Sequence, residues 1–199
     1  MIGFNRRFAP HVVKARELLR GRTEPKAFVM TVNAGAIPAN HWTQDPEAGG
    51  GRILGEGIHF VDLLRHLADA PIVDVTAIRQ QAENGSTPVR DDVAMIQLRF
   101  ADGSIGSVQY LANGSKDFPK ERLEIFCGGG VLQIDNFRVM RGYGWKGFKK
   151  LRLSRQDKGH AAEVQLMMEA IRLGQPCPIP WEEIEEVHRV VLGMMRGTG

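Results

Sequence analysis

Residues 49–62 read Gly-Gly-Gly-Arg-Ile-Leu-Gly-Glu-Gly-Ile-His-Phe-Val-Asp, a glycine-rich turn that leads directly into a predicted amphipathic helix. At helical pitch, Gly55, His59, Asp62 and His66 share one face, while the opposite face is apolar. The glycines allow positive φ and place free N–H groups at the helix start, where anions are favoured. The pattern predicts a helix that packs with its apolar face and offers its polar face to a ligand. A merely solvated polar face is the alternative.

Downstream of this helix, the sequence consists mainly of short strand-like runs separated by turn residues. Short links between consecutive strands favour antiparallel pairing. Helices are predicted from Pro10 to the region of Gly21, over Ala161–Leu173, and after Pro180. We therefore predict an α+β fold, a large, mostly antiparallel open sheet with helices packed on one face. The predicted strands are Lys26–Val32, Ile72–Gln80, Asp92–Phe100, Ser104–Leu111, Arg122–Cys127 and Val131–Asp135, and the turns are Asn84-Gly85, Asp102-Gly103, Asn113-Gly114 and Gly128-Gly129-Gly130.

The predicted strand Asp92–Phe100 is apolar on more than one face. Alternate residues from Ala94 to Phe100 are apolar, as expected for the core side. Val93 and Met95 make the other face half apolar as well. An exposed face of this kind favours oligomerisation through the sheet.

Composition limits the class of protein. The chain has 199 residues, 43% of them hydrophobic, which is enough for one domain with a proper core, and we treat residues 1–199 as a single domain. Its formal net charge of +3 lacks the clustered excess of a nucleic-acid binder. No apolar run is long enough to span a bilayer and no signal peptide is recognisable, and the two cysteines, Cys127 and Cys177, are isolated. We expect a cytoplasmic protein without a nucleic-acid or membrane partner.

Two other possible sites are set aside. The densest basic run, Lys146–Arg155, includes an aromatic residue, but a solvated hairpin is favoured because no nucleic-acid motif accompanies it. The histidines are scattered without the spacing of a metal-binding helix, so no metal site is predicted. Arg6 and Arg7 could bind an anion, although solvated or salt-bridged arginines are the favoured interpretation.

The loop after the first predicted strand contains Asn33, Asn40, His41 and Trp42. Pro38 prevents the strand from continuing through it. Hydrogen-bonding groups beside an aromatic plane are what a sugar-binding site needs, and a tryptophan that covers the edge of the core is the alternative. Both interpretations remain open at this stage.

A glycine triplet, a carboxylate and then Gly-x-His-x-x-Asp resemble the signature of the C-terminal domain of the Gfo/Idh/MocA family, which includes glucose-fructose oxidoreductase and inositol dehydrogenase. Further similar segments are Trp42 followed by Asp45-Pro46, and Lys158-Gly159-His160. The family usually has Asp four residues before the histidine, whereas here that position is Gly55 and the carboxylate is Glu56. The resemblance extends over nearly the whole chain.

The resemblance implies a fold like the C-terminal domain of dihydrodipicolinate reductase, in a substrate-binding and oligomerisation domain. It implies an enzyme that passes hydride between NAD or NADP and a hydroxyl-bearing carbon of a sugar, cyclitol or nucleotide sugar. The cofactor would be bound mainly by an N-terminal nucleotide-binding (Rossmann) domain that is absent from this chain, so the isolated domain should be inactive. The implied catalytic residues are His59, as proton acceptor, and Glu56, and the implied substrate-binding residues are Asn33, His41, Trp42, Asp62 and His160.

On a regular helix, Glu56 and Asp62 each lie three residues from His59, so either carboxylate could accept a hydrogen bond from one ring nitrogen. The other nitrogen would then face a substrate hydroxyl. The alternative function is a non-catalytic ligand-binding or oligomerisation module with the same fold.

Overall fold

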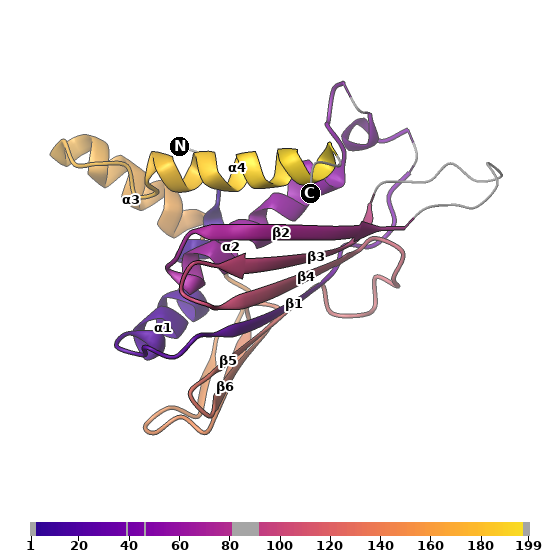
Figure 1. The fold of residues 1–199 in the computed structure, drawn as a ribbon. Coiled ribbons are helices and arrows are strands. Elements are labelled where there is room, and N and C mark those ends of the chain that lie inside the picture. The colour runs from indigo at the N-terminus through magenta and orange to yellow at the C-terminus, as the bar shows by residue number, and fades with distance from the viewer. Residues whose placement is uncertain (1–2, 39, 46, 81–91, 197–199) are drawn as a thin grey trace.

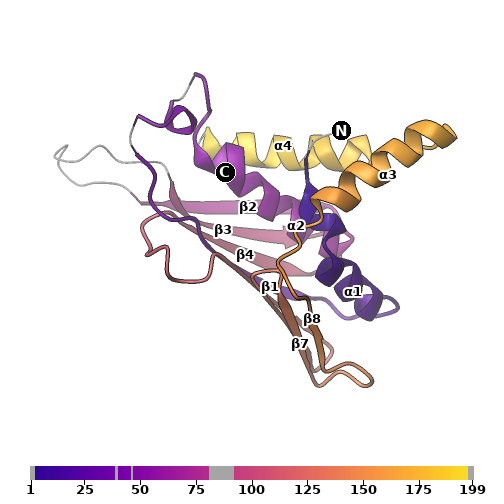
Figure 2. The same cartoon turned by 180° about the vertical axis from the view of Figure 1, so that it is seen from behind.

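The computed structural model describes residues 3–38, 40–45, 47–80 and 92–196. Its centre is one eight-stranded sheet with the order β2-β3-β4-β1-β5-β6-β7-β8, and helices lie against one of its faces (Figures 1 and 2). The predicted α+β fold with an open, mostly antiparallel sheet is confirmed. The elements in chain order are η1 (Asn5–Phe8), α1 (Pro10–Leu19), β1 (Ala27–Asn33), η2 (Trp42–Gln44), η3 (Ile53–Gly57), α2 (Ile58–Ala68), β2 (Ile72–Arg79), β3 (Val93–Phe100), β4 (Ile105–Leu111), β5 (Glu121–Cys127), β6 (Gly130–Asp135), β7 (Val139–Tyr143), β8 (Lys150–Arg152), α3 (His160–Leu173) and α4 (Trp181–Met195).

The predicted strands and helices match the observed ones closely, because their periodicity is a local signal. Strands β7 and β8 were not predicted individually, since they are short and rich in basic residues and glycine. β8 lies within the basic run Lys146–Arg155 and pairs with β7, so the favoured hairpin interpretation of that run is confirmed.

The predicted pairing around Asn113-Gly114 is wrong, because β4 and β5 are not neighbours. β1 lies between them, parallel to β4 and antiparallel to β5. The link from Leu111 to Glu121 is no tight turn and passes the end of β1. The rule that short links join antiparallel neighbours therefore does not apply here. The turn Asn84-Gly85 lies outside the described residues.

The covered face of the sheet packs against α2. In β3 the alternating residues from Ala94 to Phe100 are buried, and the apolar side chains of α2 complete this core. Gly106 in β4 permits the close approach, since a Cβ atom there would lie 2.9 Å from Leu64 Cδ1. Burial of α2 against the sheet fixes the position of His59 in its first turn.

The segment before α2, Ile53–Gly57, is a π-helical turn. Such i→i+5 turns are rare and frequently occur at functional sites. Gly57 and Ile58, the two residues between Glu56 and His59, have αR dihedrals and continue into α2.

The predicted free polar face of α2 is wrong for Asp62, which is 1% exposed. Elements distant in sequence cover this side of the helix, namely η1 and α4. Among the described residues, no helix has the length and apolar character needed to cross a membrane.

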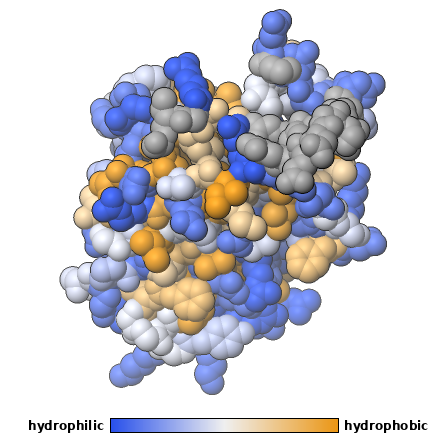
Figure 3. Space-filling model, turned by 45° about the vertical axis from the view of Figure 1, so that its right-hand side comes forward, coloured by the Kyte–Doolittle hydropathy of each residue, from blue (hydrophilic) through white to orange (hydrophobic). Residues whose placement is uncertain are grey.

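None of the helices in the described residues lies on the other face of the sheet (Figures 1 and 2). Ile78, Met95 and Ile105 are more than half exposed on it. In the space-filling view, apolar surface is interspersed with hydrophilic side chains and does not form one continuous patch (Figure 3). We call this side the open face.

Candidate active site around His59

His59 lies in the first turn of α2, with its ring edge-on to Phe4 at a centroid distance of 5.5 Å. Its Nδ1 atom is buried and has no hydrogen-bond partner within the described part of the chain. Burial, reinforced by the charge of Arg6, lowers the pKa of His59 to about 4. The imidazole is therefore uncharged at neutral pH and has a lone pair with which to accept a proton.

Glu56 is held by three side chains, from β4, from the residue before β5 and from the N-cap of η3. Tyr110 donates its hydroxyl hydrogen at 2.5 Å, Lys120 Nζ lies at 2.6 Å and Arg52 Nη2 at 3.3 Å. Burial alone raises the pKa of a carboxyl group, but the hydrogen bonds from Lys120 and Tyr110 bring that of Glu56 down to about 2. Glu56 is thus a fixed carboxylate. Its oxygens bind these groups and not the ring of His59, contrary to the predicted hydrogen bond.

Arg52 connects this carboxylate to the loop after β1. Its Nη1 donates to the carbonyl of Gly35 at 2.7 Å, and its Nη2 donates to that of Ala34 at 3.3 Å. The side chain is 7% exposed. The arginine therefore orders the loop and η3 together.

A second carboxylate, that of Glu121, also acts on His59 through its charge. Arg6 binds it through Nε and Nη2, both at 2.9 Å, and Lys158 Nζ approaches it at 2.5 Å. Burial favours the neutral acid, but Arg6 and Lys158 hold the pKa of Glu121 below its usual value. The Arg6 guanidinium also lies 4.4 Å from the centre of the Phe60 ring. The favoured interpretation of Arg6 as a salt-bridged residue is confirmed.

His59 thus lies among two ion clusters of the same composition. The charges of both Glu56 and Glu121 act on the imidazole. Each carboxylate binds one buried arginine and one more exposed lysine. Lys120 and Glu121 are consecutive at the start of β5, so one short backbone segment contributes to both clusters.

His160 is brought close to this site. It is the first residue of α3 and is exposed, and its charge lowers the pKa of His59. The start of α3 is fastened to η1, since Asn5 Nδ2 donates to the carbonyl of Lys158 at 2.7 Å. Gly159 (φ 87°) makes this possible, because a Cβ atom there would lie 2.3 Å from the Asn5 carbonyl oxygen.

Asp62 lies outside the site and forms a buried ion pair with Arg7, which also binds Glu183. Its carboxylate receives the guanidinium at 2.9 and 2.5 Å. Burial raises the pKa of Asp62 to about 6 despite these hydrogen bonds. In this structure the residue joins α2 to η1 and α4 and does not face a ligand.

Asn33 fastens a neighbouring loop. Its Nδ2 donates to the carbonyls of Ser115 and Phe118, at 2.6 and 3.1 Å. Its Oδ1 is buried without a partner in the described residues. A Cβ atom on Gly114 would come within 2.2 Å of that oxygen, so the close packing depends on glycine.

His41 and Trp42 are both exposed, His41 as the N-cap of η2 and Trp42 as its first residue. The tryptophan is 64% exposed, so the alternative in which it covers the edge of the core is wrong. His41 Nδ1 lies 2.9 Å from Thr43 Oγ1, and the two aromatic rings lie 6.1 Å apart. No hydrogen bond or ring contact in the described residues joins this pair to His59.

The sequence analysis gave no role to Arg52, which lies four residues before Glu56, nor to four polar residues from distant segments: Tyr110, Lys120, Glu121 and Lys158. These four reach the site through contacts across long sequence separations, which periodicity does not reveal. Tyr110 had one visible signal, because a tyrosine on the core side of a strand requires a partner for its hydroxyl.

The described residues hold no group of three or more histidine, cysteine, aspartate or glutamate side chains that could bind a metal. They also do not fit a nicotinamide dinucleotide. Gly128 and Gly129 belong to the β5–β6 hairpin and not to a strand-to-helix turn. Near the turn before η3, the space beside Gly49 is filled by the backbone of Thr43.

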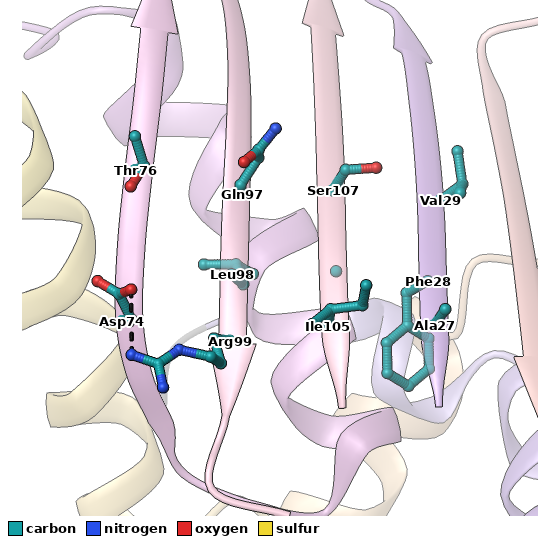
Figure 4. A pocket seen from close by; sticks show the side chains of 11 residues that line it. Ala27, Phe28, Val29, Asp74, Thr76, Gln97, Leu98, Arg99, Ile105 and Ser107 are labelled. Carbon is teal, nitrogen blue, oxygen red and sulfur yellow. Dashed lines mark hydrogen bonds and ion pairs between the residues drawn. The ribbon is translucent and has the colours of Figure 1, made fainter. Parts of the chain in front are cut away.

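A separate hollow of about 390 Å³ lies on the open face, on strands β1 to β4 (Figure 4). Thr76, Gln97 and Ser107 point into it, and an ion pair between Asp74 and Arg99 lies at one side. It contains none of the predicted site residues, and α2 runs behind the sheet. The hollow is therefore distinct from the His59 site.

Comparison with known proteins gives a consistent result. The family model for the GFO/IDH/MocA C-terminal domain matches residues 12–133. Myo-inositol 2-dehydrogenase of Thermotoga maritima is 24% identical over 196 residues, which cover 91% of this chain and 56% of that protein.

Two crystal structures share the fold at 21% sequence identity, and each is matched over 100% of this chain. Aldose-aldose oxidoreductase from Caulobacter crescentus, complexed with glycerol, has a TM-score of 0.80 with 61% of its chain covered. An NAD binding oxidoreductase from Klebsiella pneumoniae has a TM-score of 0.79 with 64% covered. The chain thus spans a little over half the length of the proteins it resembles.

Proposed function

Because the chain belongs to the GFO/IDH/MocA C-terminal domain family, we propose that it is the substrate-binding part of an NAD(P)-dependent oxidoreductase. The substrate would be a sugar, a cyclitol or a nucleotide sugar that is oxidised at a CH–OH group or formed by reduction of the ketone. A dehydrogenase of inositol and an oxidoreductase of aldoses among the similar proteins support this proposal.

The observation that carries the proposal is the environment of His59. Its imidazole is uncharged at neutral pH and lies among two fixed carboxylate clusters. In the proposed reaction it accepts the hydroxyl proton of the substrate as the C–O bond gains double-bond character. Glu56 and Glu121 stabilise the imidazolium through their charges, since both raise the pKa of His59.

The nicotinamide cofactor would be held outside this chain. It supplies the hydride acceptor or donor, and the described residues do not fit its dinucleotide. The greater length of the similar proteins supports a second, nucleotide-binding domain. Such a domain must approach His59, because reacting atoms have to come within about 3–3.5 Å of each other.

The exposed side of α3 supports the same arrangement. Val164, Met168 and Ile171, at helical spacing, are each more than half exposed, and the helix begins at His160, next to the site. We propose that the nucleotide-binding domain packs on this stripe. The open face of the sheet would instead join copies of the chain, as the sequence predicts. The cytoplasm remains the proposed location.

A specific observation favours the alternative, a non-catalytic ligand-binding or oligomerisation module. His59 Nδ1 has no hydrogen-bond partner in the described chain, and both carboxylates expected to orient the ring bind other groups. A general base usually has a partner that fixes its tautomer.

The test uses two polypeptides. The 199-residue chain alone should neither quench nor enhance NADH fluorescence on titration, and should oxidise none of a panel of cyclitols, aldoses and nucleotide sugars. The polypeptide that includes the coding sequence upstream of Met1 should bind NADH or NADPH and oxidise at least one of them. Saturable micromolar binding of NADH by the short chain would contradict the proposed division of labour. A folded long polypeptide that binds sugars without oxidising any would favour the non-catalytic module.

A further inference from the structure

The two ion clusters around His59 carry a surplus of positive charge. Arg6 and Lys158 share Glu121, and Arg52 and Lys120 share Glu56. Four cations therefore meet two carboxylates, and His59 adds no negative charge.

The surplus is particular to these two clusters. One to two turns further along α2, Arg7 and Arg65 contact three carboxylates, those of Asp62, Glu183 and Glu186. On the open face, Arg99 and Asp74 pair one to one. Concentrated charge of one sign in a half-buried site is unfavourable unless a counter-charge offsets it.

The arginines and lysines of the clusters differ in the N–H donors that remain for a ligand. Arg6 uses its Nε and Nη2 on Glu121, and Arg52 uses Nη1 and Nη2 on two carbonyls and Glu56. Both guanidinium groups are less than 10% exposed. These two side chains therefore hold the carboxylates in place.

The lysines are placed differently. The side chain of Lys120 is 41% exposed and that of Lys158 is 16% exposed. Each ammonium group has three N–H donors and makes one hydrogen bond to a carboxylate within the described residues. Each lysine thus has N–H donors left for a ligand, next to a carboxylate whose charge acts on His59.

We infer that the substrate carries an anionic group, a carboxylate or a phosphate, and that Lys120 and Lys158 bind it beside His59. The inference rests on the proposed function, because it assigns the substrate class of the same site. A neutral polyol needs only neutral donors and acceptors, whereas a carboxylate or phosphate offsets the surplus charge and takes charge-assisted hydrogen bonds from both ammonium groups.

In the experiment, the 199-residue chain is titrated with each probe, and binding is measured by isothermal titration calorimetry and by NMR. The probes are D-glucuronate, D-glucose 6-phosphate and neutral D-glucose, with acetate and inorganic phosphate as anions that lack a sugar. The variants are Lys120→Met and Lys158→Met, with Lys150→Met as the control, since that lysine is exposed in the β7–β8 hairpin. We expect one of the acidic sugars to bind about tenfold or more tightly than glucose, and each site variant to remove most of that preference. The acidic sugar that binds more tightly identifies the anionic group.

The outcomes separate this inference from the proposed function. Equal binding of glucose and both acidic sugars would leave a sugar site and overturn the inference. If both site variants kept the full preference for an acidic sugar over glucose, the inference would be overturned as well. Acetate or phosphate binding as tightly as the acidic sugars would show an anion site without sugar recognition, which also overturns it. Binding of none of the five probes by the folded chain would also overturn the inference, whereas the proposed function is tested separately, by oxidation with the long polypeptide.

Discussion

Helices α2 and α3 are both rich in apolar residues, yet their surroundings differ completely. Nine residues of α2 are buried, including the charged Asp62 and Arg65, whereas in α3 only Glu163 and Ala170 are. α2 is enclosed by the sheet, η1 and α4, while α3 extends away from the sheet (Figures 1 and 2). An apolar stripe in a sequence therefore predicts that a helix will be covered, but not by what. The covered helix carries His59, and the bare one begins beside it.

The largest expected effect on stability comes from comparing a buried side chain of α2 with an exposed side chain of α3. Leu64→Ala removes a fully buried side chain that packs on Gly106, and should lower the free energy of unfolding by about 3–4 kcal/mol. Ile171→Ala on α3 should change it by less than about 0.5 kcal/mol, because that side chain is 62% exposed. Urea denaturation of the isolated chain measures both. Equal losses would mean that α3 is covered in solution and would end the comparison.

The buried ion pair of α2 should give the next largest effect. Asp62→Ala leaves Arg7 buried with Glu183 as its remaining carboxylate, and should cost about 3 kcal/mol of unfolding free energy. The matched control is Asp74→Ala on the open face, whose exposed pair with Arg99 contributes less than about 1 kcal/mol. A loss for Asp62→Ala no larger than that of the control would show that the pair is not buried as described.

These residues also show where prediction from sequence stops. The strands and helices were predictable because alternation and helical spacing are local patterns. The insertion of β1 between β4 and β5, and the pairing of Asp62 with Arg7, depend on contacts between distant segments. His59 was found through its motif, but Tyr110 and Lys120 were not, because they meet Glu56 across more than fifty residues. The π turn before α2 also has no clear signal in sequence.

The lowered pKa of His59 predicts that the stability of the chain depends on pH. Burial lowers the pKa of His59 to about 4 in the folded chain, from about 6.5 in the unfolded one. As the pH falls from 6.5 to 4, only the unfolded state binds a proton at His59. The free energy of unfolding is therefore highest above pH 6.5 and decreases through this pH range. The loss is on the order of 2–3 kcal/mol.

The measurement is the free energy of unfolding at several pH values for the wild type and for His59→Gln. The variant should lose less stability between pH 6.5 and pH 4 than the wild type does. His41→Gln, the same substitution at an exposed side chain, is the control. An identical slope in His59→Gln would mean that His59 is protonated equally in both states.

The smallest effect on stability is expected at the bare surfaces, where the effect on assembly should be visible instead. Met95→Glu on the open face should shift a dimer or larger oligomer toward monomer in light scattering over a dilution series, while unfolding changes by less than about 0.5 kcal/mol. Met168→Glu on α3 is the control and should leave the oligomer intact. A wild type that is monomeric at high concentration would exclude assembly through the sheet.

The central claim is that His59 accepts the substrate proton, and the steady-state kcat of a His59→Gln variant tests it most directly. The measurement uses the long polypeptide defined above, with thermal unfolding recorded on the same preparation and His41→Gln as the control. We predict a kcat about 10²- to 10⁴-fold below that of the wild type in a variant that is still folded at the assay temperature. A wild-type kcat in folded His59→Gln would contradict the claim.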